Sequence, residues 1–300
     1  MTSTLEIWAA TPTPFGPDGE LFLPVVADQG KHLLAHGVHG AFVGGTSGEF
    51  PALTTGERKA LVDAWAAARP DGLALGTHVG HSTLAEAREL AAHAQSAGVD
   101  LIASVTPYFG VANTLETAVD FLAAVAAEAP TTPFLYYHFP GMTGSPYRPS
   151  ELVALAVERI PNFAGVKFTH EDLLEFDRTR AVSSKVRVYF GRDELLPAAL
   201  AFGADAVIGS LYNALAPQAH QVAAAMAAGR LADALMLHEP FRQVAAEAGR
   251  YGGVGFVKEW LNACGPDTGV ARTPWGPLPP AAHDTIERLA ASWRAVTPEG

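Results

Sequence analysis

Residues 73–105, LALGTHVGHSTLAEARELAAHAQSAGVDLIASV, contain the pattern that decides the fold. An apolar run at Leu73–His78 is followed by a segment with helical periodicity at Leu84–Ala97, and a second apolar run occupies Leu101–Val105. Buried strands separated by an amphipathic helix are typical of a parallel sheet whose two faces are covered. The stretch therefore predicts one strand–helix–strand unit.

The same alternation recurs along the chain at intervals of roughly thirty residues, which is the length of one such unit. The expected strands are Ile7–Ala10, Gly40–Val43, Leu73–His78, Leu101–Val105, Phe134–Tyr137, Phe163–Lys167, Val186–Phe190 and Ala206–Ile208. The expected helices between them are Leu23–His36, Thr55–Ala68, Leu84–Ala97, Leu115–Ala127, Ser150–Ile160, Asp172–Val182 and Leu195–Phe202. Eight alternating units predict an α/β fold, the TIM (β/α)8 barrel, and no glycine-rich dinucleotide turn follows the first strand.

The chain from residue 214 onward is alanine-rich and helical in pattern. The expected helices are Gln218–Ala228, Leu231–Ala248, Val254–Ala263 and Ala281–Val296, with a proline-rich loop over Cys264–Pro280. We interpret the first as the last barrel helix and the others as a C-terminal helical extension. The 300 residues are thus expected to form a single domain, with the barrel over about 1–230 and the extension over about 231–300.

Composition excludes several classes of function. The chain has 31 acidic and 20 basic residues, a formal net charge of −11, which disfavours nucleic acid and anionic membranes as partners. A single cysteine, Cys264, cannot form an intramolecular disulfide. We find neither a secretory leader pattern at the N-terminus nor an uninterrupted apolar stretch of about 20 residues. We expect a cytoplasmic protein with a small-molecule substrate.

Lys167 is the most informative residue, because it alone of five lysines lies within a strand-like apolar run, FAGVK at residues 163–167. Burying an unpaired ammonium is costly, so such a lysine tends to lose its proton and become a nucleophilic amine, as imine formation requires. The alternative is a strand-end lysine whose ammonium reaches solvent. Lys258, in GFVKEW, is expected to be a surface helix residue paired with a nearby acid.

Polar groups follow two other expected strands. The fifth ends in LYYHFP, residues 135–140, so strand alternation places either Tyr136 or Tyr137 at the barrel mouth, where a phenol could shuttle a proton. The second is followed by GGTSGE at residues 44–49, a turn whose amides and hydroxyls could hold a carboxylate or a phosphate. An ordinary packed aromatic and an ordinary strand–helix turn are the alternative interpretations.

The seventh and eighth expected strands end in FGRDE, residues 190–194, and IGS, residues 208–210. Two carboxylates and a hydroxyl suit a polyhydroxylated substrate, although either acid could instead be favoured by a helix dipole. The histidine pairs His32–His36 and His78–His81 lack an accompanying acid in a metal-binding pattern. No metal is expected.

Taken together, GTSGE, YYHFP, GVKFT, GRDE and GSLYN resemble, in order and spacing over nearly the whole chain, the motifs of the N-acetylneuraminate lyase / dihydrodipicolinate synthase superfamily. The N-acetylneuraminate lyase branch is the more similar. The resemblance implies a class I, Schiff-base-forming pyruvate aldolase on a (β/α)8 barrel, a homotetramer that needs no cofactor. Its substrates would be pyruvate and a 2-keto-3-deoxy sugar acid.

The resemblance also implies roles for particular residues. Lys167 would form the Schiff base, Tyr137 would shuttle protons, and Thr46 and Ser47 would bind the pyruvyl carboxylate, with Ser47 also relaying a proton. The positions expected to hold the sugar tail are Thr169, Gly191, Asp193, Glu194 and Ser210.

Three residues depart from the superfamily pattern. Phe109 stands where synthases have a second tyrosine, while Leu211 and Arg192 differ from the lyase pattern around the sugar tail. The expected reaction is cleavage of N-acetylneuraminate to pyruvate and N-acetylmannosamine. The alternatives are an aldolase or dehydratase of another 2-keto-3-deoxy sugar acid, a dihydrodipicolinate synthase, and a non-catalytic protein that binds pyruvate or a sugar acid.

Overall fold

Eight parallel strands close into a barrel in the computed structural model, which describes residues 5–296 and side chains up to residue 293. The strands are β1 (Glu6–Ala10), β2 (Gly40–Val43), β3 (Ala74–His78), β4 (Leu101–Ser104), β5 (Phe134–His138), β6 (Phe163–Phe168), β7 (Arg187–Phe190) and β8 (Ala206–Gly209). Each lies within one residue of its expected ends. The strands pair in chain order and β1 closes on β8, which confirms the TIM barrel.

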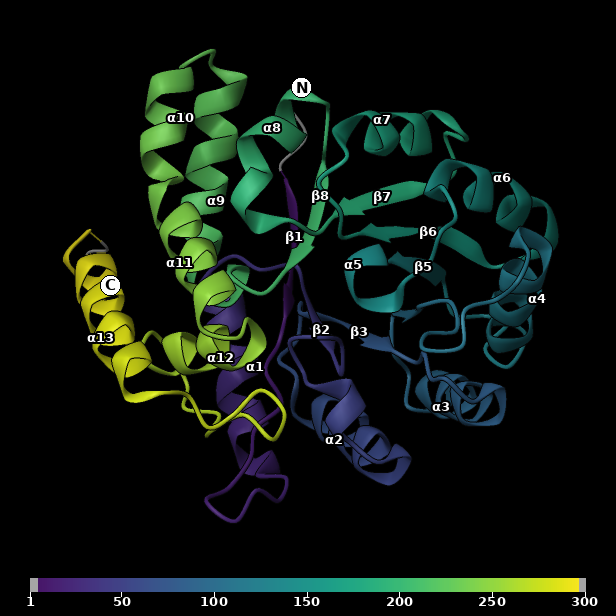
Figure 1. The fold of residues 1–300 in the computed structure, drawn as a ribbon, viewed down its shortest axis with the longest axis horizontal. Coiled ribbons are helices and arrows are strands. Elements are labelled where there is room, and N and C mark those ends of the chain that lie inside the picture. Colours follow the sequence, from purple (N-terminus) through teal and green to yellow (C-terminus); the bar gives the residue numbers. More distant parts are fainter. Residues whose placement is uncertain (1–4, 297–300) are drawn as a thin grey trace.

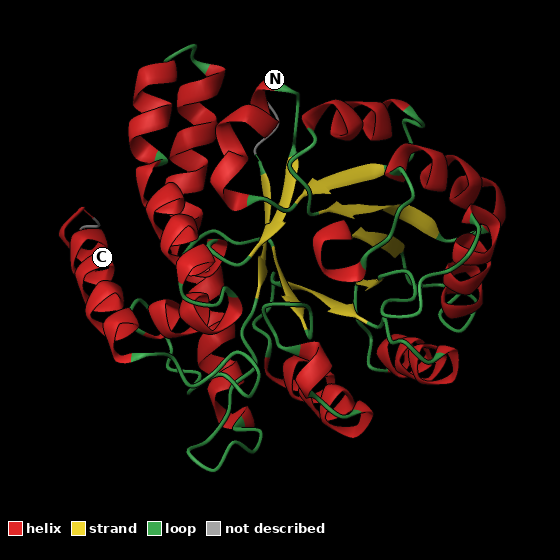
Figure 2. Cartoon of the chain, in the orientation of Figure 1, coloured by secondary structure: helices red, strands yellow, loops and turns green. Residues whose placement is uncertain are grey.

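Helices surround the strands, as Figures 1 and 2 show. Those that follow successive strands are α1 (Val26–Ala35), α2 (Thr55–Ala68), α3 (Leu84–Ser96), α4 (Leu115–Ala126), α6 (Pro149–Arg159), α7 (Leu173–Ala181), α8 (Leu196–Ala201) and α9 (Tyr212–Ala227). The expected start of α1 is a separate 3-10 turn, Leu23–Val25, and the short helix α5 (Pro140–Thr143) is not expected from the sequence.

Helix α9 begins at Tyr212, six residues before its expected start at Gln218, and therefore contains Pro217. Proline has no N–H to donate to the carbonyl four residues earlier, which here belongs to Asn213. The Nε2 atom of His32 lies 2.9 Å from that carbonyl oxygen and replaces the missing donor. A side chain from α1 thus satisfies a backbone group that proline leaves open.

The C-terminal segment is also helical, as expected, but one expected helix is two. Residues 231–248 divide into α10 (Leu231–Leu237) and α11 (Glu239–Arg250), since Pro240 in the first turn of α11 cannot extend the preceding hydrogen-bond ladder. They are followed by α12 (Val254–Asn262) and α13 (Pro280–Val296). Figure 1 shows α10 to α13 on the β1 and β8 side of the barrel. The expected organisation, a single domain with the barrel over about 1–230 and the extension over about 231–300, stays a prediction.

Strand alternation divides the buried side chains between the barrel interior and the layer beneath the helices. Phe42 and Tyr137 belong to the interior cluster, whereas Tyr136 belongs to the outer one. Tyr137 pairs in register with Lys167 on β6, and Lys167 pairs with Tyr189 on β7. The barrel interior therefore brings a phenol and an amine together on adjacent strands.

The structure tests the expected absence of a membrane-spanning helix, but only for the residues it describes. Among residues 5–296, no helix combines the length and apolar character that crossing a membrane requires. The first four residues, part of the segment in which no leader is expected, lie outside the described residues, as do the last four of the expected extension. Cytoplasmic location stays a prediction.

Candidate active site

Lys167 lies near the carboxyl end of β6, where it is 4% exposed. Its Nζ atom donates a hydrogen bond to Thr169 Oγ1 at 3.2 Å and lies 3.7 Å from the centroid of the Tyr137 ring. The side-chain nitrogen does not reach bulk solvent, which contradicts the alternative interpretation of a strand-end lysine that extends into water. A buried amine whose contacts are a hydroxyl and an aromatic face can be approached from the barrel mouth.

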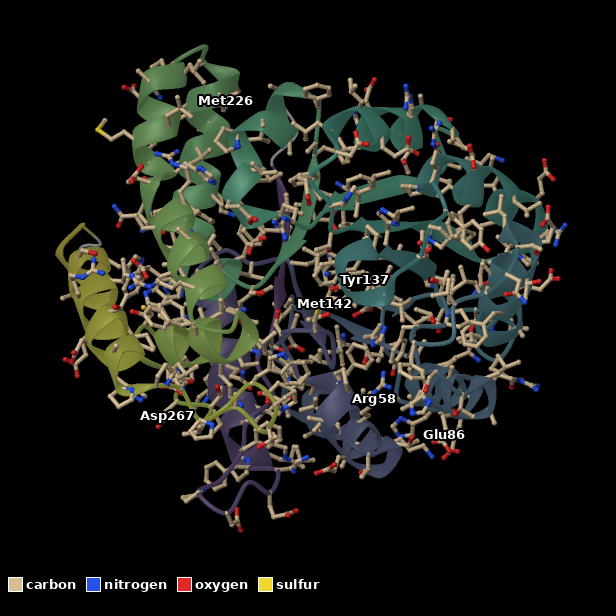
Figure 3. The ribbon with its side chains drawn as sticks, in the orientation of Figure 1. Arg58, Glu86, Tyr137, Met142, Met226 and Asp267 are labelled. Atoms are coloured by element: carbon tan, nitrogen blue, oxygen red, sulfur yellow. The ribbon has the colours of Figure 1, made fainter. Side chains whose placement is uncertain are left out.

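The two adjacent tyrosines of β5 face opposite sides. Tyr137 points into the barrel, where its hydroxyl oxygen lies 3.1 Å from Thr46 Oγ1, while Tyr136 points outward with its hydroxyl 3.1 Å from His138 Nδ1. Burial raises the pKa of Tyr136 well above its ordinary value, so it stays a neutral phenol. Tyr137 is therefore the tyrosine that strand alternation places in the barrel interior, near the middle of the molecule in Figure 3.

The turn at residues 44–49 closes over the barrel mouth. Thr46 contacts Tyr137, and Ser47 Oγ lies 2.6 Å from Ser210 Oγ at the end of β8. Helix α2 begins only at Thr55, after a 3-10 turn, and is capped by Thr54, so the turn is not the cap of that helix. Its hydroxyls instead join the ends of two other strands.

Asp193 lies in the turn after β7 and is buried. Its Oδ2 accepts a hydrogen bond from the Leu211 amide at 2.8 Å, whereas Oδ1 is buried with no partner among the described residues. Burial is the main cause that raises the pKa of this carboxyl to about 7, and the Leu211 amide opposes the shift. The bond to Leu211 links Asp193 to the end of β8, so its role extends beyond the dipole of its own helix.

Two glycines make room for these groups. A Cβ atom at Gly209 would overlap the Asp193 carboxylate, and one at Gly191 would overlap Thr169 Oγ1. Glu194 differs from Asp193, because it is partly exposed and its Oε1 lies 2.9 Å from Arg192 Nη2. Arg192, which departs from the superfamily pattern, therefore neutralises one of the two expected tail-binding acids.

All the sequence-predicted site residues line one cavity of about 330 Å³. They are Thr46, Ser47, Tyr137, Lys167, Thr169, Gly191, Asp193, Glu194 and Ser210. Binding sites for small molecules are of this size or somewhat larger. Sequence reasoning missed the helical wall of the cavity. This wall comes from α11, α12 and the residue before α12, and its members are Ala245, Ala248, Gly249, Gly253, Val254, Val257, Lys258 and Leu261. Small and apolar residues on a helix carry no signal that they face a ligand.

Lys258 is not a surface residue, so its expected exposure is wrong. It is 1% exposed, and its Nζ lies 2.8 Å from Oε1 of Glu49, which is fully buried. The expected acidic partner exists, but it lies 209 positions away in the chain, where a local helical pattern cannot reveal it.

A buried histidine, His78, lies beside Tyr137, and a buried arginine, Arg58, contacts that histidine. Arg58 donates to the Gly80 carbonyl at 2.9 Å, and the His78 ring meets the Tyr137 ring edge to face at 5.7 Å between centroids. Burial, followed by the charges of Arg58 and Lys167, lowers the pKa of His78 well below its ordinary value, so the imidazole is neutral. Within residues 5–296 no group of three or more His, Cys, Asp or Glu could hold a metal ion, and the absence of a metal stays a prediction.

Comparison with known proteins gives consistent matches. A model of the dihydrodipicolinate synthetase family matches residues 3–292. The N-acetylneuraminate lyase of Xenopus tropicalis is 39% identical over 230 residues, which is 75% of this chain and 75% of that protein. The solved N-acetylneuraminate lyase of Proteus mirabilis has a TM-score of 0.93 at 31% identity, covering 98% of this chain and 99% of that one. The corresponding structure from Aliivibrio salmonicida has a TM-score of 0.94 at 30% identity over 100% of both chains. The superfamily resemblance of the sequence is thereby confirmed: the chain belongs to the dihydrodipicolinate synthetase family, with N-acetylneuraminate lyases among its relatives.

Proposed function

We propose that the protein is a class I pyruvate-dependent aldolase, a carbon–carbon lyase that cleaves N-acetylneuraminate to pyruvate and N-acetylmannosamine. The observation that carries the proposal is the buried amine of Lys167, 3.7 Å from the Tyr137 ring, inside a cavity lined by hydroxyls and carboxylates. The similarity to N-acetylneuraminate lyases from an amphibian and two bacteria supports the choice of substrate.

In the proposed mechanism, the amine of Lys167 adds through its lone pair to the C2 ketone of the sugar acid. Tyr137 protonates the carbinolamine hydroxyl, which leaves as water and produces a protonated imine. The Tyr137 phenolate then takes the proton of the C4 hydroxyl. As C3–C4 breaks, that oxygen becomes the aldehyde and the electron pair moves into the imine to form an enamine. Return of the proton to C3, then hydrolysis of the imine, releases pyruvate and the free lysine.

The turn at residues 44–49 suits the substrate carboxylate. Thr46 holds the Tyr137 hydroxyl at 3.1 Å, and Ser47 offers a hydroxyl that already bonds to Ser210. In the proposal both residues bind the carboxylate, and Ser47 provides the alternative route for the C4 hydroxyl proton, to the substrate carboxylate instead of to Tyr137. No metal or organic cofactor takes part, since the protonated imine supplies the electrophile.

The remaining cavity residues would bind the polyhydroxylated tail. Asp193 carries the specific argument, because its buried Oδ1 has no partner in the described residues and a substrate hydroxyl would satisfy it. Glu194, Thr169, Ser210 and the backbone at Gly191 complete the proposed tail site. Asp193, Glu194 and Gly191 would act on binding of the sugar rather than on imine formation. Thr169 and Ser210 would also contact the pyruvyl end, since Thr169 accepts a hydrogen bond from Lys167 Nζ and Ser210 bonds to Ser47.

The alternatives differ in what they need from the site. An aldolase or dehydratase of another 2-keto-3-deoxy sugar acid would use the same lysine and tyrosine. Dihydrodipicolinate synthase is disfavoured, since Phe109, where synthases have a tyrosine, has no hydroxyl to relay a proton. A non-catalytic binding protein has no use for an amine beside a phenol. We also propose a homotetramer in the cytoplasm.

Borohydride reduction in the presence of pyruvate tests the proposal. We expect a stable secondary amine on Lys167, located by mass spectrometry of peptides, and no adduct without pyruvate. An unmodified Lys167 would overturn the Schiff-base mechanism. Lys258, the second buried lysine of the cavity, is an internal control in the same digest and should stay unmodified.

A pyruvate-release assay over a panel of 2-keto-3-deoxy acids then tests the substrate. We expect N-acetylneuraminate to give the highest kcat/KM of the panel. Faster release from a shorter, non-acylated sugar acid would replace the proposed substrate while leaving the imine mechanism in place.

A further inference from the structure

The turn that carries Thr46 and Ser47 ends in a residue with an unusual backbone. Glu49 has φ 57, in the left-handed region that non-glycine residues seldom adopt, and its side chain is fully buried. Such a conformation persists only where the surroundings hold it. The contacts of Glu49 therefore determine whether the turn keeps its shape.

Both carboxylate oxygens of Glu49 are bound to the C-terminal segment. Oε1 accepts a hydrogen bond from Lys258 Nζ at 2.8 Å, and Oε2 accepts one from the Arg272 amide at 2.7 Å. Each residue lies more than two hundred positions further along the chain. A residue of the barrel mouth is thus fixed by α12 and the loop that follows it.

Lys258 has no donor to spare for a ligand. Besides Glu49, its Nζ donates to the carbonyl oxygens of Thr13 at 2.8 Å and Val270 at 3.4 Å, and it lies 4.1 Å from the centroid of the Phe15 ring. An ammonium has three hydrogens, and three acceptors are present. Although Lys258 lines the cavity, its ammonium donates its three hydrogen bonds to acceptors of the protein itself.

Thr13 adds a second support to the same turn. Its hydroxyl donates to the Gly48 carbonyl at 2.6 Å, next to Glu49. Gly48 itself is packed closely, since a Cβ there would lie 3.0 Å from the Gly44 amide nitrogen. The turn is therefore held at its end, while Thr46 and Ser47 face the cavity.

We infer that Glu49, Lys258 and Thr13 are positioning residues for the reaction, which hold the turn at residues 44–49 in the shape that binds the substrate carboxylate. The inference rests on the proposed function. It makes the C-terminal helical segment part of the pyruvate site, although Lys258 touches no reacting atom. A purely structural ion pair would affect folding and leave the affinity for pyruvate unchanged in the folded enzyme.

The test uses the double variant Glu49→Gln/Lys258→Met, which removes both buried charges together and so avoids stranding one of them. The pyruvate concentration that half-saturates borohydride trapping is measured on the full-length enzyme, with the circular dichroism spectrum as a check of folding. We expect the half-saturating concentration to rise about tenfold, the loss of roughly one charge-assisted hydrogen bond to the carboxylate. A folded double variant with wild-type saturation overturns the inference.

Glu259→Gln is the matched control. Glu259 follows Lys258 on α12, and its Oε2 lies 3.1 Å from His283 Nδ1 on α13, so this ion pair also holds the C-terminal segment but involves neither Arg272 nor the turn. Its loss should lower thermal stability and leave pyruvate saturation unchanged. If the half-saturating pyruvate concentration rose equally in the control, the effect would come from a general weakening of the C-terminal segment. That result would overturn the inference.

Thr13→Val decides the matter if the double variant fails to fold. It keeps the shape and the ion pair but removes the hydroxyl that binds Gly48, and we expect a rise of about threefold in the half-saturating pyruvate concentration. Unchanged saturation in this variant overturns the inference. If instead the wild-type enzyme gives no pyruvate adduct, the proposed function itself is wrong, an outcome distinct from all of these.

Discussion

The cavity contains two buried lysines with opposite surroundings. Lys167 on β6 contacts a hydroxyl and an aromatic face, whereas Lys258 on α12 has a carboxylate and two carbonyls around its ammonium. Burial lowers the pKa of Lys258 and Glu49 opposes that shift. Burial alone therefore does not make a lysine a nucleophile; the partners decide whether the nitrogen is free to react or holds other residues in place.

Replacing the reactive lysine should give the largest effect. Lys167→Met removes the only atom that can form the imine, so we expect kcat to fall at least about a thousandfold, to the level of catalysis that binding and oriented groups alone supply. Pyruvate release from N-acetylneuraminate measures it. Substantial turnover in this variant, accompanied by an adduct on Lys258, would reverse the assignment of the two lysines.

The next effect should come from the phenol beside Lys167. Tyr137→Phe keeps the ring against the amine but removes the proton carrier, and general acid–base groups contribute about 10²–10⁴ to rate. We expect kcat to fall by that factor, with trapping still detectable after long incubation with pyruvate. Steady-state kinetics check this, and a variant with normal kcat would show that another group carries the proton.

Lys258→Met alone should affect stability more than chemistry. It leaves the Glu49 carboxylate buried without its cation, and breaking such a pair costs about 3–5 kcal/mol. Denaturant unfolding should show this loss, and the double variant with Glu49→Gln should recover part of it. If Lys258→Met were as stable as the wild type, the ion pair with Glu49 would not stabilise the fold. The structural role that distinguishes Lys258 from Lys167 would then be wrong.

The smallest effect concerns Asp193, a buried carboxyl that, like Lys167, has no ion-pair partner among the described residues. It should appear in how the free energy of unfolding depends on pH. Asp193 has a pKa of about 7 in the folded protein, above its ordinary value of 3.8, because it is buried. Between these values the unfolded chain binds fewer protons than the native one, so this group's contribution to stability is full below pH 3.8 and is lost as pH rises through 7. Asp193→Asn should therefore weaken the decline in unfolding free energy over that interval.

Urea titrations at several pH values measure the decline. If the pH dependence were the same in Asp193→Asn as in the wild type, burial would not raise the pKa of Asp193. Its carboxylate would then be ionised in the native state and would be a charged neighbour of Lys167.

The sequence predicts the barrel and the reactive end of the cavity because both depend on local patterns. Strand limits follow from apolar runs, and Lys167 stands out because a charged residue interrupts one of them. The role of Lys258 could not be predicted in this way, since GFVKEW is an ordinary helical pattern and Glu49 reaches it only through the closed fold. The early start of α9 was likewise hidden, because it depends on His32 supporting the helix at Pro217.

The close packing around Asp193 and Thr169 also limits which cavity positions can accept a larger side chain. Position 209 admits no side chain without displacing the Asp193 carboxylate, and position 191 none without displacing Thr169. Across the cavity, a Cβ added at Gly249 on α11 would meet nothing within 4 Å. New substrate ranges should therefore evolve, or be engineered, from the helical wall, while the strand ends remain restricted to the residues they now have.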